Sequence, residues 1–168
     1  CTSLTTLPDN LLPATTLASM CYSYMFSGCT GLTTIPSNLL PATTLADRCY
    51  SGMFSGCTSL TNTPELPATT LAVSCYYEMF NSTSLTTAPE LPATTLANNC
   101  YESMFENCTS LVETPEGWYL PAQTTASYSC SRMFAYCSKL QKMAVSYSGT
   151  ITASDWRNFL YGVSSTGT

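Results

Sequence analysis

The chain has no histidine and few charged residues, which narrows the chemistry open to it. Charged residues make up 9% of its 168 residues, with five Lys and Arg against ten Asp and Glu. Without histidine, the Ser-His and Cys-His nucleophile pairs cannot form, and the sparse basic residues form no patch of the nucleic-acid-binding kind. The sequence therefore predicts a protein that is not an enzyme and has no nucleic-acid partner.

Long apolar runs are also missing. No run approaches the roughly 20 residues that span a bilayer, so we expect no membrane insertion within this chain. Hydrophobic residues nevertheless make up 45% of the sequence, a share that indicates a folded rather than a disordered chain.

What the chain does contain is one motif repeated five times. A Leu-Pro-Ala element starts after steps of 28, 26, 25 and 29 residues, at Leu12, Leu40, Leu66, Leu91 and Leu120. These steps fall within the range of leucine-rich repeats, whose units bury their apolar residues only by stacking on their neighbours. Cys1 already occupies the column later filled by Cys29 and Cys57, so we also expect the array to belong to a longer protein.

Each repeat carries two segments that favour extended backbone and one segment with helical spacing. Threonine pairs near prolines favour strands, as in residues 4–7 and 14–17, because β-branched side chains are stiff and proline is excluded from helix interiors. From Cys21, the residues Met25, Phe26 and Cys29 follow at +4, +5 and +8, on one face of a short helix. The predicted fold class is an α/β leucine-rich-repeat solenoid of about five coils of short parallel strands plus a short helix.

The repeat pattern ends at Cys137, which divides the chain into leucine-rich repeats (1–137) and a C-terminal capping segment (138–168). In the capping segment, Ser154 or Asp155 is placed to cap a short helix, with Trp156, Phe159 and Leu160 on one face. We expect this segment to cover the open end of the array.

One string carries a resemblance to a known family. Met25-Phe-Ser-Gly-Cys29-Thr-Gly-Leu32 recurs at residues 53–60 and 104–111 and resembles the BspA-like, or treponemal-type, leucine-rich repeat. The resemblance covers about residues 1–140. It implies a bacterial surface or secreted adhesion protein, or a phage-borne relative, and hence an extracellular or cell-surface location.

Ten cysteines invite metal, disulfide and free-thiol interpretations. Zinc sites favour close cysteine pairs, often with histidine, so we predict no metal and no cofactor. On the predicted helix, Cys21 and Cys29 would lie about 12 Å apart, whereas a disulfide needs Cα atoms within roughly 7 Å. Two columns of five cannot pair off: Cys21, Cys49, Cys75, Cys100, Cys130 and Cys1, Cys29, Cys57, Cys108, Cys137. We therefore interpret the cysteines as buried free thiols.

Two sets of residues form the candidate binding surface. The first is a ladder of threonines that we expect to face outward on successive coils: Thr43, Thr44, Thr69, Thr70, Thr94 and Thr95. The second is Tyr77 together with Trp118 and Tyr119, which lie in an insertion that lengthens the fifth loop. Both sets have a structural alternative, because threonines also serve solubility and coil packing, and the Trp-Tyr pair can plug the end of the array.

These patterns predict a non-catalytic adhesion or protein-interaction module whose partner is a host or bacterial surface protein or glycan. Two alternatives remain open. One is the receptor-binding part of a phage tail fibre, which would assemble as a trimer. The other is a structural spacer that holds another domain away from a surface.

Overall fold

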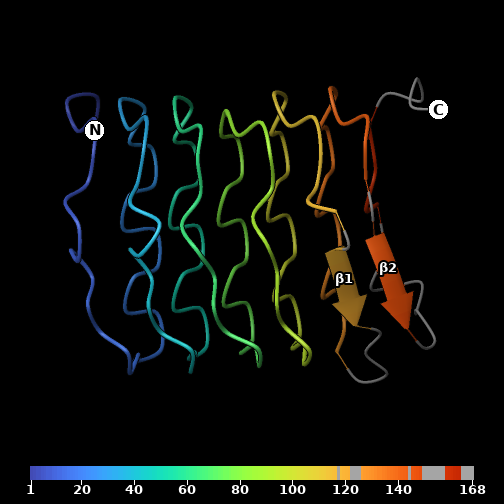
Figure 1. Cartoon of the computed structure of the whole chain (residues 1–168), viewed down its shortest axis with the longest axis horizontal. Helices are drawn as coiled ribbons and strands as arrows, with labels where there is room; N and C mark the ends of the chain where they lie inside the picture. Colours follow the sequence, from blue (N-terminus) through green and yellow to red (C-terminus); the bar gives the residue numbers. More distant parts are fainter. Residues whose placement is uncertain (117, 122–125, 144, 149–157, 164–168) are drawn as a thin grey trace.

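The chain winds as a row of stacked coils from one end of the molecule to the other. A computed structural model describes residues 1–116, 118–121, 126–143, 145–148 and 158–163. The coils stand side by side along the longest axis, with the N-terminus at one end of the row (Figure 1). Stacking of successive repeats, which the repeat spacing predicted, is therefore present.

The predicted fold class, an α/β leucine-rich-repeat solenoid of strands and helices, is wrong. The described residues contain no helix, and their only strands are β1 (Trp118–Pro121) and β2 (Val145–Ser148), which pair in parallel. Elsewhere the threonine segments meet at isolated parallel bridges, such as Thr44 with Thr70. A proline lies close to each threonine pair on one side, as Pro36 follows Thr34 and Pro41 precedes Thr43, and supplies no N–H for a longer ladder.

The segment predicted to be a helix is a run of overlapping turns. The amide of Ser23 donates to the carbonyl of Met20 within its own coil, at 3.2 Å, whereas the amide of Tyr24 donates to Ser51 of the next coil, at 2.8 Å. This alternation continues along the segment and recurs in the following coils. Because every second amide is directed at a neighbouring coil, the i to i−4 bonds of an α-helix cannot form.

A left-handed backbone recurs at every fourth residue of this turn segment. In the first coil, Met20, Tyr24 and Gly28 have φ of 60°, 54° and 68°. The same positions of later coils share this backbone: Arg48, Gly52, Gly56, Ser74, Glu78, Ser82, Asn99, Ser103, Asn107, Tyr128, Arg132 and Tyr136. Most of them are the third residue of a hydrogen-bonded turn, as Tyr24 is between Tyr22 and Met25, and this position has φ above zero in type II turns. The turn segment thus repeats every four residues. The +4, +5 and +8 spacing of its apolar residues reflects this repeat of turns rather than a helix.

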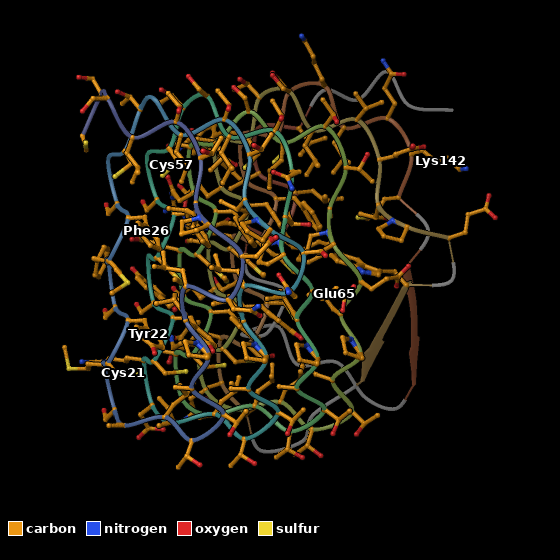
Figure 2. All side chains as sticks on the ribbon, turned by 60° about the vertical axis from the view of Figure 1, so that its left-hand side comes forward. Cys21, Tyr22, Phe26, Cys57, Glu65 and Lys142 are labelled. Atoms are coloured by element: carbon orange, nitrogen blue, oxygen red, sulfur yellow. The ribbon has the colours of Figure 1, made fainter. Side chains whose placement is uncertain are left out.

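Columns of stacked rings fill the interior. Phenylalanine rings of neighbouring coils lie 5.4–5.8 Å apart between centroids, in the order Phe26, Phe54, Phe80, Phe105 and Phe134. A second column runs from Tyr22 through Tyr50 and Tyr76 to Tyr101, at 6.0 Å per step. Figure 2 places Tyr22 and Phe26 on one side of the coil, and Glu65 and Lys142 on the opposite side. The turn segments therefore supply the aromatic core.

The fifth coil shifts one cysteine out of its predicted column. The amide of Tyr76 donates to the carbonyl of Cys100, and the amide of Tyr101 donates to the carbonyl of Ser129. Ser129 therefore continues the column of Cys100, and Cys130 takes the place that tyrosine has in the earlier coils. The first cysteine column holds four members rather than the predicted five.

The described parts of the C-terminal segment continue the stack. The amide of Gln141 donates to Val112, β2 pairs with β1, and the amide of Phe134 donates to Phe159 at 3.0 Å. Phe159 is buried, whereas Leu160 is exposed. These parts form a further, degenerate coil, while the boundary after residue 137 stays a prediction. Ser154, Asp155 and Trp156, the predicted cap and face residues, lie outside the described residues.

We predict that Met79→Ala or Phe80→Ala lowers the free energy of unfolding by about 2–5 kcal/mol, because each change leaves a cavity in a close-packed core. Both side chains are fully buried in a central coil. Met25 occupies the methionine column in the first coil and is 49% exposed, so Met25→Ala should change stability by only about 0.5 kcal/mol. Urea unfolding of the three variants measures the difference, and equal midpoints would contradict this packing.

We also predict that the far-ultraviolet circular dichroism spectrum of the folded protein lacks the double minimum of an α-helix. The described turn segments contain no i to i−4 bonded helix. A helix in each repeat would give a strong helical signal. Such a signal, lost on unfolding, would restore the helical interpretation of the +4, +5 and +8 spacing.

Candidate functional site

The threonine ladder lies on the outside of the stack, as predicted. Thr43, Thr44, Thr69 and Thr70 are exposed, as are Thr94 and Thr95 of the next coil. Parallel bridges join Thr44 to Thr70 and Thr70 to Thr95. The second threonines of the three pairs thus lie in register on three successive coils, and we call these three residues the threonine face.

The first threonine of a pair can form hydrogen bonds between coils. The hydroxyl of Thr94 donates to the carbonyl of Thr69 at 3.4 Å, and the amide of Thr94 donates to the same carbonyl at 2.8 Å. A similar bond joins the hydroxyl of Thr61 to the carbonyl of Thr33 in the other threonine segment. These two first-position hydroxyls therefore contribute to coil stacking.

Trp118 does not lie on a binding surface. Its side chain is 1% exposed, and its Nε1 donates to the carbonyl of Pro89 at 3.0 Å. The indole packs against Phe105 and Phe134, with centroids at 6.3 and 5.7 Å. The insertion therefore returns its tryptophan to the core, which is the plug alternative. Tyr119 lies in β1, and its side chain is outside the described part of the structure.

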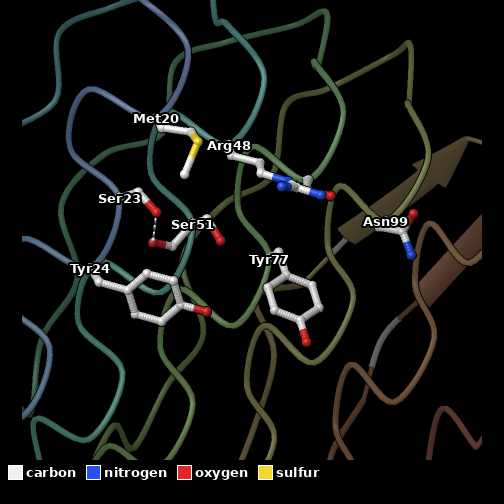
Figure 3. A pocket seen from close by; sticks show the side chains of 8 residues that line it. Met20, Ser23, Tyr24, Arg48, Ser51, Tyr77 and Asn99 are labelled. Atoms are coloured by element: carbon white, nitrogen blue, oxygen red, sulfur yellow. Dashed lines mark hydrogen bonds between the residues drawn. The ribbon is translucent and has the colours of Figure 1, made fainter.

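Tyr77 lines a pocket on the outer surface of the turn segments, which we call the turn face. The pocket has a volume of about 400 Å³ and is lined by Met20, Ser23, Tyr24, Arg48, Ser51, Ser74, Tyr77 and Asn99. These residues come from four successive coils, and Figure 3 shows the rings of Tyr24 and Tyr77 on either side of Ser51. Of the predicted site residues, only Tyr77 lines this pocket.

The ring of Tyr24 is seated on a glycine of the next coil. A Cβ added at Gly52 would lie 2.1 Å from Cε1 of Tyr24, so any larger residue would displace the ring. The phenol then reaches the third coil, where its hydroxyl donates to Oε2 of Glu78 at 3.4 Å. Tyr24 remains 48% exposed. An aromatic ring thus lies across the surface of three coils.

The polar groups at the pocket are of mixed character. Burial and the Glu78 carboxylate together raise the pKa of both Tyr24 and Tyr77, so both hydroxyls are protonated at neutral pH. Arg48 is exposed and forms no ion pair with any described residue. The amide nitrogen of Asn99 donates to Glu102. The pocket therefore offers hydroxyls and a guanidinium beside two aromatic rings, and the carboxylates of Glu78 and Glu102 accept hydrogen bonds from two of its lining residues.

The sequence analysis did not identify Arg48, Ser74 or Asn99 as pocket residues. All three occupy left-handed positions of the turn repeat, and that repeat was interpreted as a helix. Recurrent glycine and asparagine at four-residue spacing, as at Gly52 and Gly56, was the signal that could have located this face.

The buried cysteines make hydrogen bonds that hold their thiols in place. Sγ of Cys57 donates to the carbonyl of Phe26 at 3.1 Å, and Sγ of Cys108 donates to that of Phe80 at 3.1 Å. Thr83 replaces cysteine in the fourth unit, and its hydroxyl donates to the same Phe80 carbonyl at 2.9 Å. Burial raises the pKa of Cys57 and of Cys108 to about 11, which keeps these thiols protonated.

We predict that only Cys1 and Cys21 react readily with iodoacetamide in the folded protein at pH 8. These two are exposed, and the other eight are buried. The thiolate is the reactive form, and burial suppresses both its formation and its access to reagent. Unfolding in denaturant without reductant should expose ten alkylation sites by mass spectrometry. Recovery of two or more disulfides from the native protein would contradict this prediction.

Neither a metal centre nor a membrane span is found in the part of the chain that the structure describes. No three Cys, Asp or Glu side chains there come close enough to share an ion. No helix there is long and apolar enough to cross a bilayer.

Comparison of the chain with protein families, curated proteins and solved structures found no match. The resemblance to BspA-like repeats therefore remains a prediction from the residues alone. The helix that the spacing of Cys21, Met25, Phe26 and Cys29 predicts is not present in the described residues.

Proposed function

We propose that the chain is a non-catalytic interaction module, placed at a cell surface or outside the cell, that binds a surface protein or glycan. One observation carries this proposal. Thr44, Thr70 and Thr95 lie exposed and in bridged register on three successive coils. A surface of this kind offers a partner repeated neutral contacts rather than one reactive centre.

The rigidity of the scaffold favours binding by such a face. Backbone hydrogen bonds join the coils on the turn side. Stacked rings join them in the interior, as between Phe54 and Phe80, whose centroids lie 5.7 Å apart. Side chains on a rigid support lose little further freedom when a partner binds, which lowers the entropic cost of association. The bridges hold the threonine face at fixed spacing before any partner arrives.

The composition of the face fixes the character of its partner. Threonine offers a methyl group and a hydroxyl that both donates and accepts. A partner that fits this face is therefore uncharged at the contact and carries hydroxyl or amide groups, as peptide backbones and glycans do.

We predict that replacing Thr44, Thr70 and Thr95 together with Lys leaves the fold intact but weakens adhesion to host cells or immobilised glycans at least about tenfold. Exposed changes cost within about 0.5 kcal/mol each. Three ammonium groups buried against an uncharged partner would lack counter-charges. Thermal unfolding and a plate adhesion assay measure the two effects.

The matched control carries the same change at Thr30, Thr58 and Thr109, which are also exposed but follow the second cysteine column. This control has the same added charge and should adhere like the parent. Equal adhesion by all three proteins would show that the threonine face only supports the stack. Light scattering of the parent addresses the phage-fibre alternative, since a trimer would favour it.

A further inference from the structure

We propose that the pocket on the turn face binds a neutral, extended oligosaccharide whose sugar rings follow the row of coils. This inference deepens the proposed function and rests on it, because it names a ligand class and a second site. The pocket is separate in composition from the threonine face, with which it shares no lining residue.

Tyr24 provides an aromatic platform of the kind that stacks on the C–H face of a sugar ring. Its ring lies over Gly52, where no side chain intervenes, and its hydroxyl is held by Glu78. The tyrosine keeps close to half of its surface exposed despite these contacts. A ring fixed in this way has a free surface and loses little freedom on binding.

The polar groups around the platform match hydroxyl ligands. A sugar hydroxyl donates one hydrogen bond and accepts two, so it requires donors and acceptors together. Arg48 supplies N–H donors without a competing ion pair among the described residues, and Asn99 supplies a carboxamide oxygen that can accept. Ser51 and Ser74 line the floor with further hydroxyls. Few other neutral ligands combine a face for aromatic stacking with so many hydroxyls.

The charges near the pocket select against an acidic ligand. Arg48 is its only basic lining residue, whereas Glu78 contacts Tyr24, and Glu102 accepts a bond from the lining residue Asn99. A carboxylated or sulfated sugar would gain one guanidinium and meet two carboxylates. Like charges in a shared site disfavour binding, so a neutral glycan fits better.

The direction and size of the pocket favour a linear chain. Its lining residues span four coils, and the tyrosine rings of the turn segments repeat at 6.0 Å from coil to coil. Sugar rings in an extended β-linked glycan advance by a similar length, so successive rings meet equivalent positions of successive coils. Tyr24 and Tyr77 lie two coils apart and would contact alternate sugars. The volume of about 400 Å³ lies within the ordinary range for ligand pockets.

The test is calorimetric titration of the folded chain with cellohexaose and chitohexaose, which are extended and β-linked, and with maltohexaose, whose α-linked chain coils. We expect at least one β-linked hexasaccharide to bind and maltohexaose to bind at least about tenfold more weakly. Tyr24→Ala should weaken binding about tenfold through loss of the stacking platform. Tyr24→Phe keeps the ring and should retain most of the affinity.

Tyr136→Ala is the matched control. Tyr136 also has a left-handed backbone, is 40% exposed and lies against a glycine, Gly162, but it does not line the pocket. Its removal should leave the affinity within about twofold of the parent. Thermal unfolding of both alanine variants shows whether a loss of binding reflects a loss of fold.

The outcomes separate this inference from the proposed function. Absence of binding by both β-linked hexasaccharides, or equal binding by Tyr24→Ala and the parent, would overturn the pocket assignment. If cell adhesion then still depends on the threonine face, the proposed function stands without the pocket. Adhesion that persists in the triple-lysine protein would instead remove the threonine face as the adhesive surface, whatever the titrations show for the pocket.

Discussion

The alternation of backbone hydrogen bonds in the turn segment fixes the rest of the structure. One amide closes a turn within its own coil, as from Ser23 to Met20, and the next joins the following coil, as from Tyr24 to Ser51. Such a segment satisfies its own backbone and its neighbour's at once, which helices and strands do not do together. The register between coils is therefore set by the backbone. As a result, side chains at equivalent positions of successive repeats must stack in columns.

Column stacking explains why the repeat keeps the same residue types. A phenylalanine placed over another phenylalanine packs at 5.7 Å between centroids with nearly parallel rings. Cysteine suits its column because it is small and its thiol donates to a phenylalanine carbonyl of the preceding coil, as from Cys57 to Phe26. Thr83 fits the same column in another way, because its hydroxyl donates to Phe80 of its own coil and lies 3.2 Å from Sγ of Cys108.

The sequence predicts much of the buried core. It does not predict the local backbone conformation of the turn segments. Repeat spacing and apolar columns predict that Phe80 and Met79 are buried and that the threonine pairs lie outside. The +4, +5 and +8 pattern fits periods of 3.6 and 4 equally over so short a segment. Left-handed residues with large side chains, such as Tyr24 and Arg48, carry no sequence signal for that backbone. The one-residue shift at Cys130 is visible only once coils are aligned by their hydrogen bonds.

A period of four divides the turn segment between the core and the surface. Two of every four residues point inward as Cys-Tyr or Met-Phe, and the other two lie on the outer side of the turns, where some, such as Ser51 and Ser103, are still covered. These outward positions differ between coils: Tyr24, Gly52 and Glu78 share one column. Their differences combine, since the glycine makes room for the tyrosine and the glutamate holds its hydroxyl. A repeat that is uniform inside can thus carry a specific site outside, at the positions that break the repeat.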